Sequence, residues 1–90
     1  MPIIIRRDTE ENGEMLLELC PSDWELPIQV YRLEKWLEDF DLPWPEGSYV
    51  ADIGFTMRPD ATGGGATLSV ASMRRLAELG IELWFSEHPM

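Results

Sequence analysis

Two short stretches near the start of the chain carry the hydrophobic pattern of β-strands. Residues 3–7 begin with three consecutive isoleucines, and β-branched residues favour extended backbone. Residues 14–20 follow the period of a half-buried strand, with one set of side chains on each face: Met15, Leu17 and Leu19 against Glu14, Leu16 and Glu18. Asn12-Gly13 lies between the two stretches and suits a tight turn, so the pattern predicts a hairpin.

The pattern then changes to a helical period that continues to about residue 40. Two signals compete for the start of this helix: Ser22 and Glu25 have capping-box spacing, and Pro27 suits a first helical turn. The apolar positions recur at 3.6-residue spacing: Val30, Leu33, Trp36, Leu37 and Phe40. The proline-rich residues 42–47 end the helix. A strict alternation after them predicts a strand whose apolar face contains Tyr49, Ala51, Ile53, Phe55 and Met57.

The last part of the chain predicts a second helix and a final strand. Ser69 is a suitable N-cap, Gly80 a suitable helix stop, and residues 81–85 read as a strand. The helix between them has these apolar positions: Val70, Met73, Leu76, Ala77 and Leu79. We therefore expect one α+β domain over residues 1–90, a two-layer sandwich of order ββαβαβ with a four-stranded mixed sheet and both helices on one face. An extra short strand near 66–69 would instead give a ferredoxin-like fold.

The alternation also assigns the strand residues to two faces of the sheet. The face toward the helices should hold Met15, Leu17, Leu19, Tyr49, Ala51, Ile53, Phe55, Ile81, Leu83 and Phe85. The opposite face should hold Glu14, Leu16, Glu18, Val50, Asp52, Thr56, Glu82, Trp84 and Ser86. A tryptophan on a mostly polar face is a candidate anchor for a partner, because Trp is enriched among the residues that dominate interface energies. The simpler interpretation is that an open face carries a few apolar side chains.

Composition narrows the classes of function. The 90 residues carry 17 acidic and 7 basic side chains, a net charge of −10, which argues against free nucleic acid and anionic membranes as ligands. No apolar run is long enough to span a bilayer, and the order of basic and apolar residues at the start is not that of a secretory signal. Cys20 is the sole cysteine, so no internal disulfide forms. We expect a cytoplasmic protein.

The motifs that could carry chemistry are weak. Residues 62–67 contain three consecutive glycines between a strand and a helix but lack the spacing of a phosphate-binding loop. His88 and Cys20 lie far apart in the sequence and have no zinc-ligand spacing. Paired carboxylates such as Asp39 and Asp41 arise by chance in so acidic a chain. We therefore expect neither a metal nor another cofactor, and no catalytic activity.

The charges are segregated along the chain. Seven carboxylates and no lysine or arginine lie between residues 8 and 25, and five more lie between 34 and 46 beside the single Lys35. The arginines instead form the pairs Arg6-Arg7 and Arg74-Arg75, with single arginines elsewhere. This distribution predicts a negative surface that could dock onto a basic one. A solvated surface that keeps a small protein soluble is the simpler explanation.

Leu68-Ser69, Met73-Arg74-Arg75 and the following residues to Ser86 resemble the end of a bacterial family of domains of unknown function. Those domains also close with a Leu-Ser-capped helix, a Leu-Gly stop and a strand, and the resemblance implies no residue role. In size, acidity and lack of cofactor motifs the chain is similar to the small acidic anti-CRISPR proteins of phages and to toxin-immunity proteins.

The functional hypothesis from sequence is an inhibitor-type binding protein that blocks a basic surface of a nucleic-acid-handling protein. Its first candidate site is the open sheet face, with Glu14, Leu16, Glu18, Asp52, Glu82 and Trp84. The next candidates lie on the long helix and just after it: Glu34, Glu38, Asp39 and Asp41. The alternative is a structural accessory domain in which the open face, with Leu16, Val50 and Trp84, is a homodimer seam.

Overall fold

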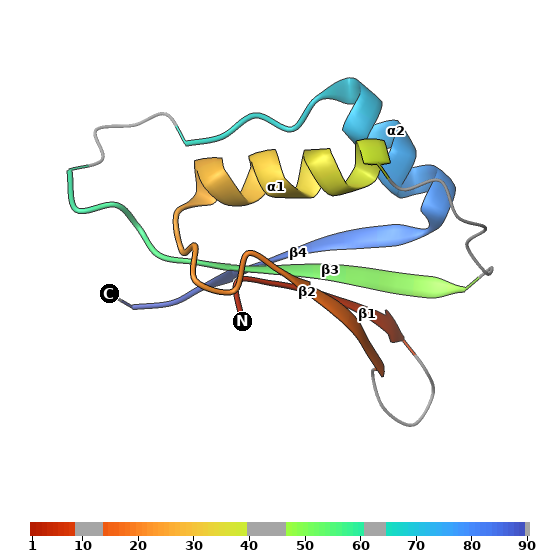
Figure 1. Ribbon diagram of the computed structural model, residues 1–90, viewed down its shortest axis with the longest axis horizontal. Helices are drawn as coiled ribbons and strands as arrows, with labels where there is room; N and C mark the ends of the chain where they lie inside the picture. The colour runs from red at the N-terminus through yellow and green to blue at the C-terminus, as the bar shows by residue number, and fades with distance from the viewer. Residues whose placement is uncertain (9–13, 40–46, 61–64, 90) are drawn as a thin grey trace.

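The fold is the α+β sandwich that the hydrophobic pattern predicts. The computed structural model describes residues 1–8, 14–39, 47–60 and 65–89 (Figure 1). The elements follow in the predicted order: β1 (Ile3–Asp8), β2 (Glu14–Leu19), α1 (Leu26–Asp39), β3 (Ser48–Phe55), α2 (Val70–Leu79) and β4 (Ile81–Glu87). They form one four-stranded sheet of order β2-β1-β3-β4. β1 is antiparallel to both of its neighbours, while β3 and β4 are parallel because α2 carries the chain back between them.

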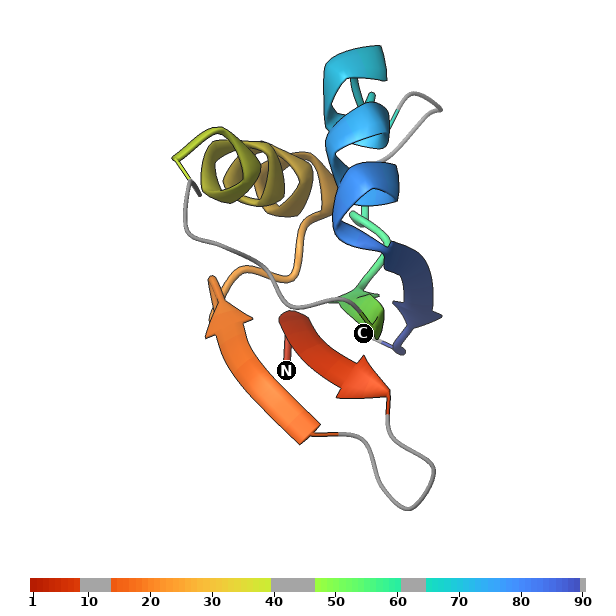
Figure 2. The same cartoon turned by 90° about the vertical axis from the view of Figure 1, so that its right-hand side faces the viewer.

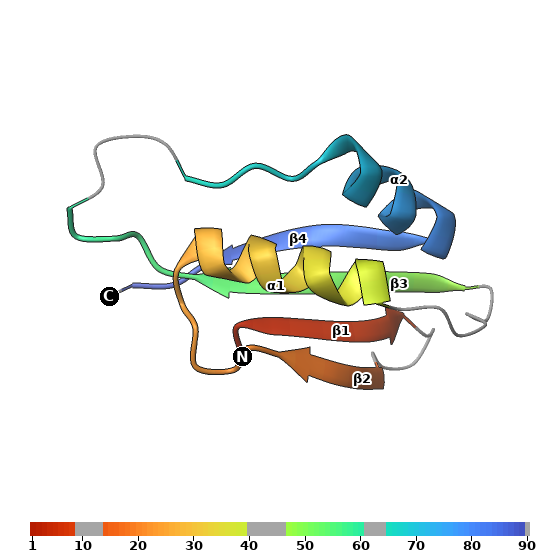
Figure 3. The ribbon, with the colours of Figure 1, turned by 45° about the horizontal axis from the view of Figure 1, so that its top comes forward.

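Both helices cover the same face of the sheet, and none of the helices in the described residues lies on the other face (Figures 1 and 2). Residues 65–69 belong to neither a helix nor a strand, so the ferredoxin-like alternative with a strand near 66–69 is wrong. This segment runs on the helix side of the sheet and leads into α2, where Ser69 caps the helix (Figure 3). It is therefore not a strand of the sheet.

The hydrophobic core lies between the two central strands and the helices. Ile3 and Ile5 of β1, Ile53 of β3 and Leu33 of α1 are fully buried. β1 and β3 are flanked by strands on both sides, so their helix-facing residues are the most completely covered. Further buried members complete the cluster: Leu37, Tyr49, Ala51, Leu76, Leu79 and Ile81.

A β-bulge in β2 interrupts the alternation that the sequence predicts. Ile5 pairs with Leu17, but the next residue, Arg6, pairs with Met15, so Leu16 is an extra residue on β2. Glu14 and Met15, which precede the bulge, therefore lie on the sheet faces opposite to those predicted. Met15, predicted for the core, lies opposite Arg6 and is 63% exposed. The prediction for Met15 is wrong because a one-residue shift moves a side chain to the other face.

The helix ends follow local sequence signals. α1 begins at Leu26 with Pro27 in its first turn, so Pro27 rather than the Ser22–Glu25 pair marks the start. In α2, the Oγ atom of Ser69 accepts a hydrogen bond from the backbone N–H of Ser72 at 3.1 Å, which confirms the predicted N-cap.

Gly80 ends α2 in the left-handed conformation, with φ +72°. A Cβ atom at this position would lie 2.9 Å from the carbonyl oxygen of Gly47. The carbonyl of Gly80 also accepts the N–H of Tyr49 at 3.1 Å, at the start of the β3–β4 pairing. Gly80 therefore both ends α2 and makes a hydrogen bond at the start of the pairing between β3 and β4.

The region over β4 is less covered than predicted. The buried stripe of α2 is Ser72, Leu76 and Leu79, while Val70 and Met73 are 61% and 49% exposed. Among the apolar positions predicted at 49–57 and 81–85, Phe55 and Leu83 are half-buried, and Met57 and Phe85 are exposed. α2 has ten residues and is about 15 Å long, whereas the seven residues of β4 extend about 23 Å. The helix therefore covers only part of the strand.

Candidate functional site

The sheet face opposite the helices, called the open face below, consists of two rows of residues that cross all four strands. Strand spacing of about 4.8 Å makes each row about 14 Å wide. In strand order, the first row is Glu18, Ile4, Asp52 and Trp84, and the second is Met15, Arg6, Val50 and Glu82. The open face therefore carries three carboxylates, one guanidinium and one indole.

Trp84 is held in a fixed orientation on this face by two contacts from different strands. The Cζ atom of Arg6 lies 4.5 Å from the centroid of the indole ring. The Nε1–H of Trp84 donates a hydrogen bond of 2.7 Å to the carboxylate of Glu82. A cation–π contact at an exposed site contributes about 0.5–1 kcal/mol. The ring is thus ordered although 41% of Trp84 is exposed.

Asp52 connects the network across β1, β3 and β4. Its Oδ2 atom lies 3.5 Å from Nη1 of Arg6, and its Oδ1 atom accepts a hydrogen bond of 2.6 Å from the hydroxyl of Ser86. The side chain of Asp52 is 15% exposed. Val50 is fully buried although it belongs to the open face. Asp52 therefore orients Arg6 and carries little free charge at the surface.

The six predicted sheet-face residues do not all lie together. The register brings four of them onto the open face: Glu18, Asp52, Glu82 and Trp84. Glu14, beyond the bulge, pairs with Arg7 in the row of Tyr49, which belongs to the helix side. Leu16 is the bulge residue and is 40% exposed. The placement of Glu14 on the open face is therefore wrong, and the reason is the same shift that exposes Met15.

Glu34 of α1 is engaged in holding α2. Its Oε2 atom accepts hydrogen bonds from the hydroxyl of Ser72 at 2.6 Å and from the backbone N–H of Ser69 at 3.0 Å. These bonds, the one from Ser72 first, hold the pKa of Glu34 below its usual value. The positive end of the helix dipole also stabilises a carboxylate at the start of α2. Glu34 is therefore a junction between the helices and not a free docking charge.

The other acidic residues predicted near α1 do not form one surface. Glu38 faces α2 and lies 3.8 Å from the ammonium of Lys35. Asp39 lies on the β2 side of the helix. Asp41 falls outside the described residues. Positions 34, 38 and 39 therefore project in two directions from α1 and do not gather these carboxylates into one patch.

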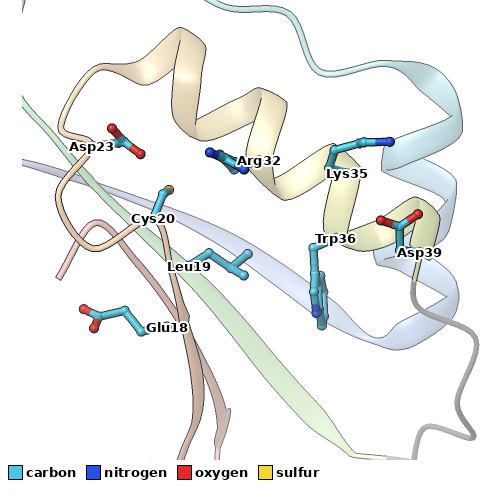
Figure 4. Close-up of a pocket in the computed structure, with 8 residues that line it drawn as sticks. All are labelled: Glu18, Leu19, Cys20, Asp23, Arg32, Lys35, Trp36 and Asp39. Atoms are coloured by element: carbon cyan, nitrogen blue, oxygen red, sulfur yellow. The ribbon is translucent and has the colours of Figure 1, made fainter.

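A groove lies between α1 and the end of β2 (Figure 4). Its volume is about 410 Å³. Eight residues line it: Glu18, Leu19, Cys20, Asp23, Arg32, Lys35, Trp36 and Asp39. The groove mixes three carboxylates with two cations, so it has no strong preference for a ligand of one charge.

Cys20 lies at one end of this groove, where its thiol points toward α1 between Asp23 and Arg32 (Figure 4). Burial, and then the charge of Asp23, raise the pKa of the thiol, although Arg32 acts in the opposite direction. A raised pKa leaves the thiol protonated at neutral pH, and the thiolate is the reactive form. This environment does not activate a nucleophile.

Arg6 is the residue of the open face that the functional prediction from sequence left out. It was assigned to a basic pair distinct from the acidic surface, yet it stacks on Trp84 and pairs with Asp52. The alternation of β1 contained the signal, because Ile3 and Ile5 face the core and Arg6 must face away. The cross-strand register that brings it to Asp52 is a tertiary property.

Comparison with family models, curated proteins and solved structures finds no match to this chain. Among the described residues, no helix combines the length and apolar character needed to cross a membrane. Over the same part of the chain, no group of three or more His, Cys, Asp or Glu side chains is placed to hold a metal ion. The contacts of Trp84 with Arg6 and Glu82 are the surface feature from which a function is argued below.

Proposed function

We propose that this domain is a non-catalytic protein-binding module that docks its open face onto a basic protein surface. The observation that carries the proposal is the ordered, half-exposed indole of Trp84, fixed by Arg6 and Glu82. An aromatic side chain that is already immobilised loses little conformational entropy on binding. Tryptophan is also the residue type most enriched in interface hot spots.

Charge supports a basic partner. Glu82 and Glu18 lie on the open face on either side of the central strands, Glu18 being 3.1 Å from the N-terminal ammonium, and the whole chain has a net charge of −10. Complementary charge accelerates association and rejects acidic competitors. Arg6 does not oppose this, because its guanidinium is paired with Asp52 and stacked on the indole.

The class of partner follows from the same chemistry. A protein surface that binds nucleic acid presents lysine and arginine to phosphates. A domain with dense carboxylates and an aromatic anchor complements such a surface. We therefore propose that the partner handles nucleic acid and that the domain is an inhibitor of the anti-CRISPR-like or immunity-like type, which occupies the phosphate-binding surface of that partner.

An NMR titration tests the proposal. The ¹⁵N-labelled protein is titrated with a purified basic DNA-binding domain, and the indole N–H signal of Trp84 is followed. We expect that signal and the backbone signals of β4 and β3 to move, and a DNA duplex added in excess to reverse the change. Movement confined to α1, or no competition by DNA, would contradict the proposed surface.

Matched variants separate the site from general acidity. Trp84→Ala should weaken binding at least about tenfold, as removal of a hot-spot aromatic does. Tyr31→Ala, which removes a 60% exposed aromatic from α1, should leave affinity unchanged. Glu82→Lys should weaken binding more than Glu78→Lys, although each reverses one exposed charge. Equal effects of the two charge reversals would show that only net charge matters.

A further inference from the structure

The outer edge of β4 presents unpaired backbone groups. β4 ends the strand order, and no strand among the described residues pairs with its outer side. Bonds to β3 start at the carbonyl of Gly80 and finish at the N–H of His88. In a regular parallel ladder the residues that bond the neighbour alternate, so the even-numbered residues of β4 face β3. The N–H and C=O groups of Leu83, Phe85 and the other odd-numbered residues therefore point outward.

Apolar side chains surround this edge on both faces of the sheet. Trp84 lies on the open face, while Phe85, which is 60% exposed, lies on the helix side. α2 adds a further apolar stripe. Ala71 and Arg75 border the groove toward α1. At about 100° per residue, the opposite side of the helix carries the exposed residues Val70, Met73 and Ala77.

We propose that two copies of this chain pair antiparallel through their β4 edges, with the two-fold axis at Trp84, to form a continuous eight-stranded sheet. This register pairs all seven residues of β4. Trp84 meets Trp84 of the second copy at a non-hydrogen-bonded position, where cross-strand side chains are closest. Leu83 meets Phe85 of the second copy at a hydrogen-bonded position, which uses the outward backbone groups.

The charges of β4 fit a second copy in this register. Glu82 lies opposite Ser86 of the second copy, and Glu87 lies opposite Ile81, so no two carboxylates face each other. The strand β2, with Glu14 and Glu18, is three strand spacings away, about 14 Å. That distance exceeds the Debye length of about 8 Å at physiological ionic strength. The carboxylates of β2 therefore oppose pairing at the β4 edge only weakly.

The proposed dimer does not depend on the proposed function. It places the homodimer interface at the β4 edge, whereas the sequence predicted it on the open face. A seam on the open face would cover the rows of Trp84 and Glu18. Edge pairing instead joins the two open faces into one surface with paired tryptophans at its centre. Loss of dimerisation and loss of partner binding are measured separately, so either idea can fail without the other.

Sedimentation equilibrium is the first test. The intact chain should show a monomer–dimer equilibrium in the micromolar range. Phe85→Lys should weaken it at least about tenfold, since the substitution replaces a buried contact by two like charges near the axis. The matched control is Met15→Lys, which places the same charge at a 63% exposed methionine on the β2 edge and should leave dimerisation unchanged. A strictly monomeric chain, or equal effects of both variants, would overturn the proposal.

Cysteine cross-linking tests the register. In a Cys20→Ser background, Trp84→Cys should form an intermolecular disulfide rapidly, since Cα atoms at a non-hydrogen-bonded pair lie about 4.5 Å apart. Glu82→Cys should not, because residue 82 and its copy would be separated by four residues along the strand, about 13 Å. A dimer in which Glu82→Cys cross-links as fast as Trp84→Cys would refute the two-fold at Trp84.

Discussion

The two edge strands of the sheet differ in how they present their unpaired backbone. β2 contains a bulge at Leu16, and each of its faces carries one glutamate, as the faces of β4 do with Glu82 and Glu87. β4 pairs without a register shift over all seven residues, and its most exposed large side chains are Trp84 and Phe85. Bulges and charges are the usual means by which natural sheets prevent edge-to-edge association.

The comparison indicates that a bulge protects only the β2 edge of this sheet, since both edge strands carry glutamates. A bulged strand twists locally and breaks the regular spacing that an added strand needs. A straight strand with an apolar border offers both the hydrogen bonds and the hydrophobic contact for pairing. The β4 edge is therefore the one to test for association, and the β2 edge is the internal control.

The largest expected effect concerns the helix that covers β4. Leu76→Ala removes a side chain that is 5% exposed between α2 and the sheet, and it should lower the free energy of unfolding by about 3 kcal/mol. Leu17→Ala makes a similar truncation on β2, but Leu17 is only half-buried and should cost about 1 kcal/mol. Urea denaturation measures both. Equal losses of unfolding free energy in the two variants would show that the β2 and β4 edges depend equally on the hydrophobic core.

A smaller and pH-dependent effect is expected at the junction that anchors α2 over β4. The pKa of Glu34 is lower in the folded chain than in the unfolded one, because Ser72 and Ser69 bond its ionised form. Its contribution to stability is therefore complete above the ordinary carboxyl pKa and is lost as pH falls through the lowered folded-state value.

Glu34→Gln should reduce stability by about 1 kcal/mol at neutral pH, the scale of a helix cap or a hydrogen bond. The stability curves of the variant and the parent chain should converge at acid pH. Urea unfolding at a series of pH values measures this. A difference that stays constant down to low pH would mean that ionisation of Glu34 contributes nothing.

The smallest effect on stability is expected from deletion of Leu16, which would restore the regular pairing of β2. Leu17 already pairs with Ile5 and Met15 with Arg6, so the shortened strand can keep both pairs. The free energy of unfolding should change by less than about 1 kcal/mol. In a Phe85→Lys background, which blocks the other edge, sedimentation should then reveal new association through β2. A deletion variant that stays monomeric would show that the bulge is not what protects this edge.

The order of elements and the two-layer arrangement could be predicted because they depend on periods of two and 3.6 residues. Leu33 and Ile53 lie where those periods place them, in the core. Ser69 and Gly80 mark the ends of α2 through local backbone preferences that a sequence displays directly.

The faces of β2 and the composition of the candidate site could not be predicted in full. A bulge leaves no local signal in the sequence of residues 14–19, so Met15 and Glu14 were assigned to the wrong faces. The partners of Glu34 and Arg6 lie 35 or more positions away, at Ser69, Ser72 and Asp52, and only the packing of α1 against α2 and the sheet register bring them together. Charge segregation along the chain therefore overestimated the free negative surface.

The turn at Gly80 limits how this chain can diversify. Any L-residue there would adopt a disfavoured positive φ, and its Cβ would meet the carbonyl oxygen of Gly47 at 2.9 Å. The Gly47 carbonyl is part of the backbone and cannot move aside as the end of a flexible side chain can. The carbonyl of Gly80 also accepts the N–H of Tyr49 at the start of the parallel pairing of β3 with β4. Residues on the open face and along the β4 edge can therefore be exchanged without strain at this turn, while position 80 itself requires glycine.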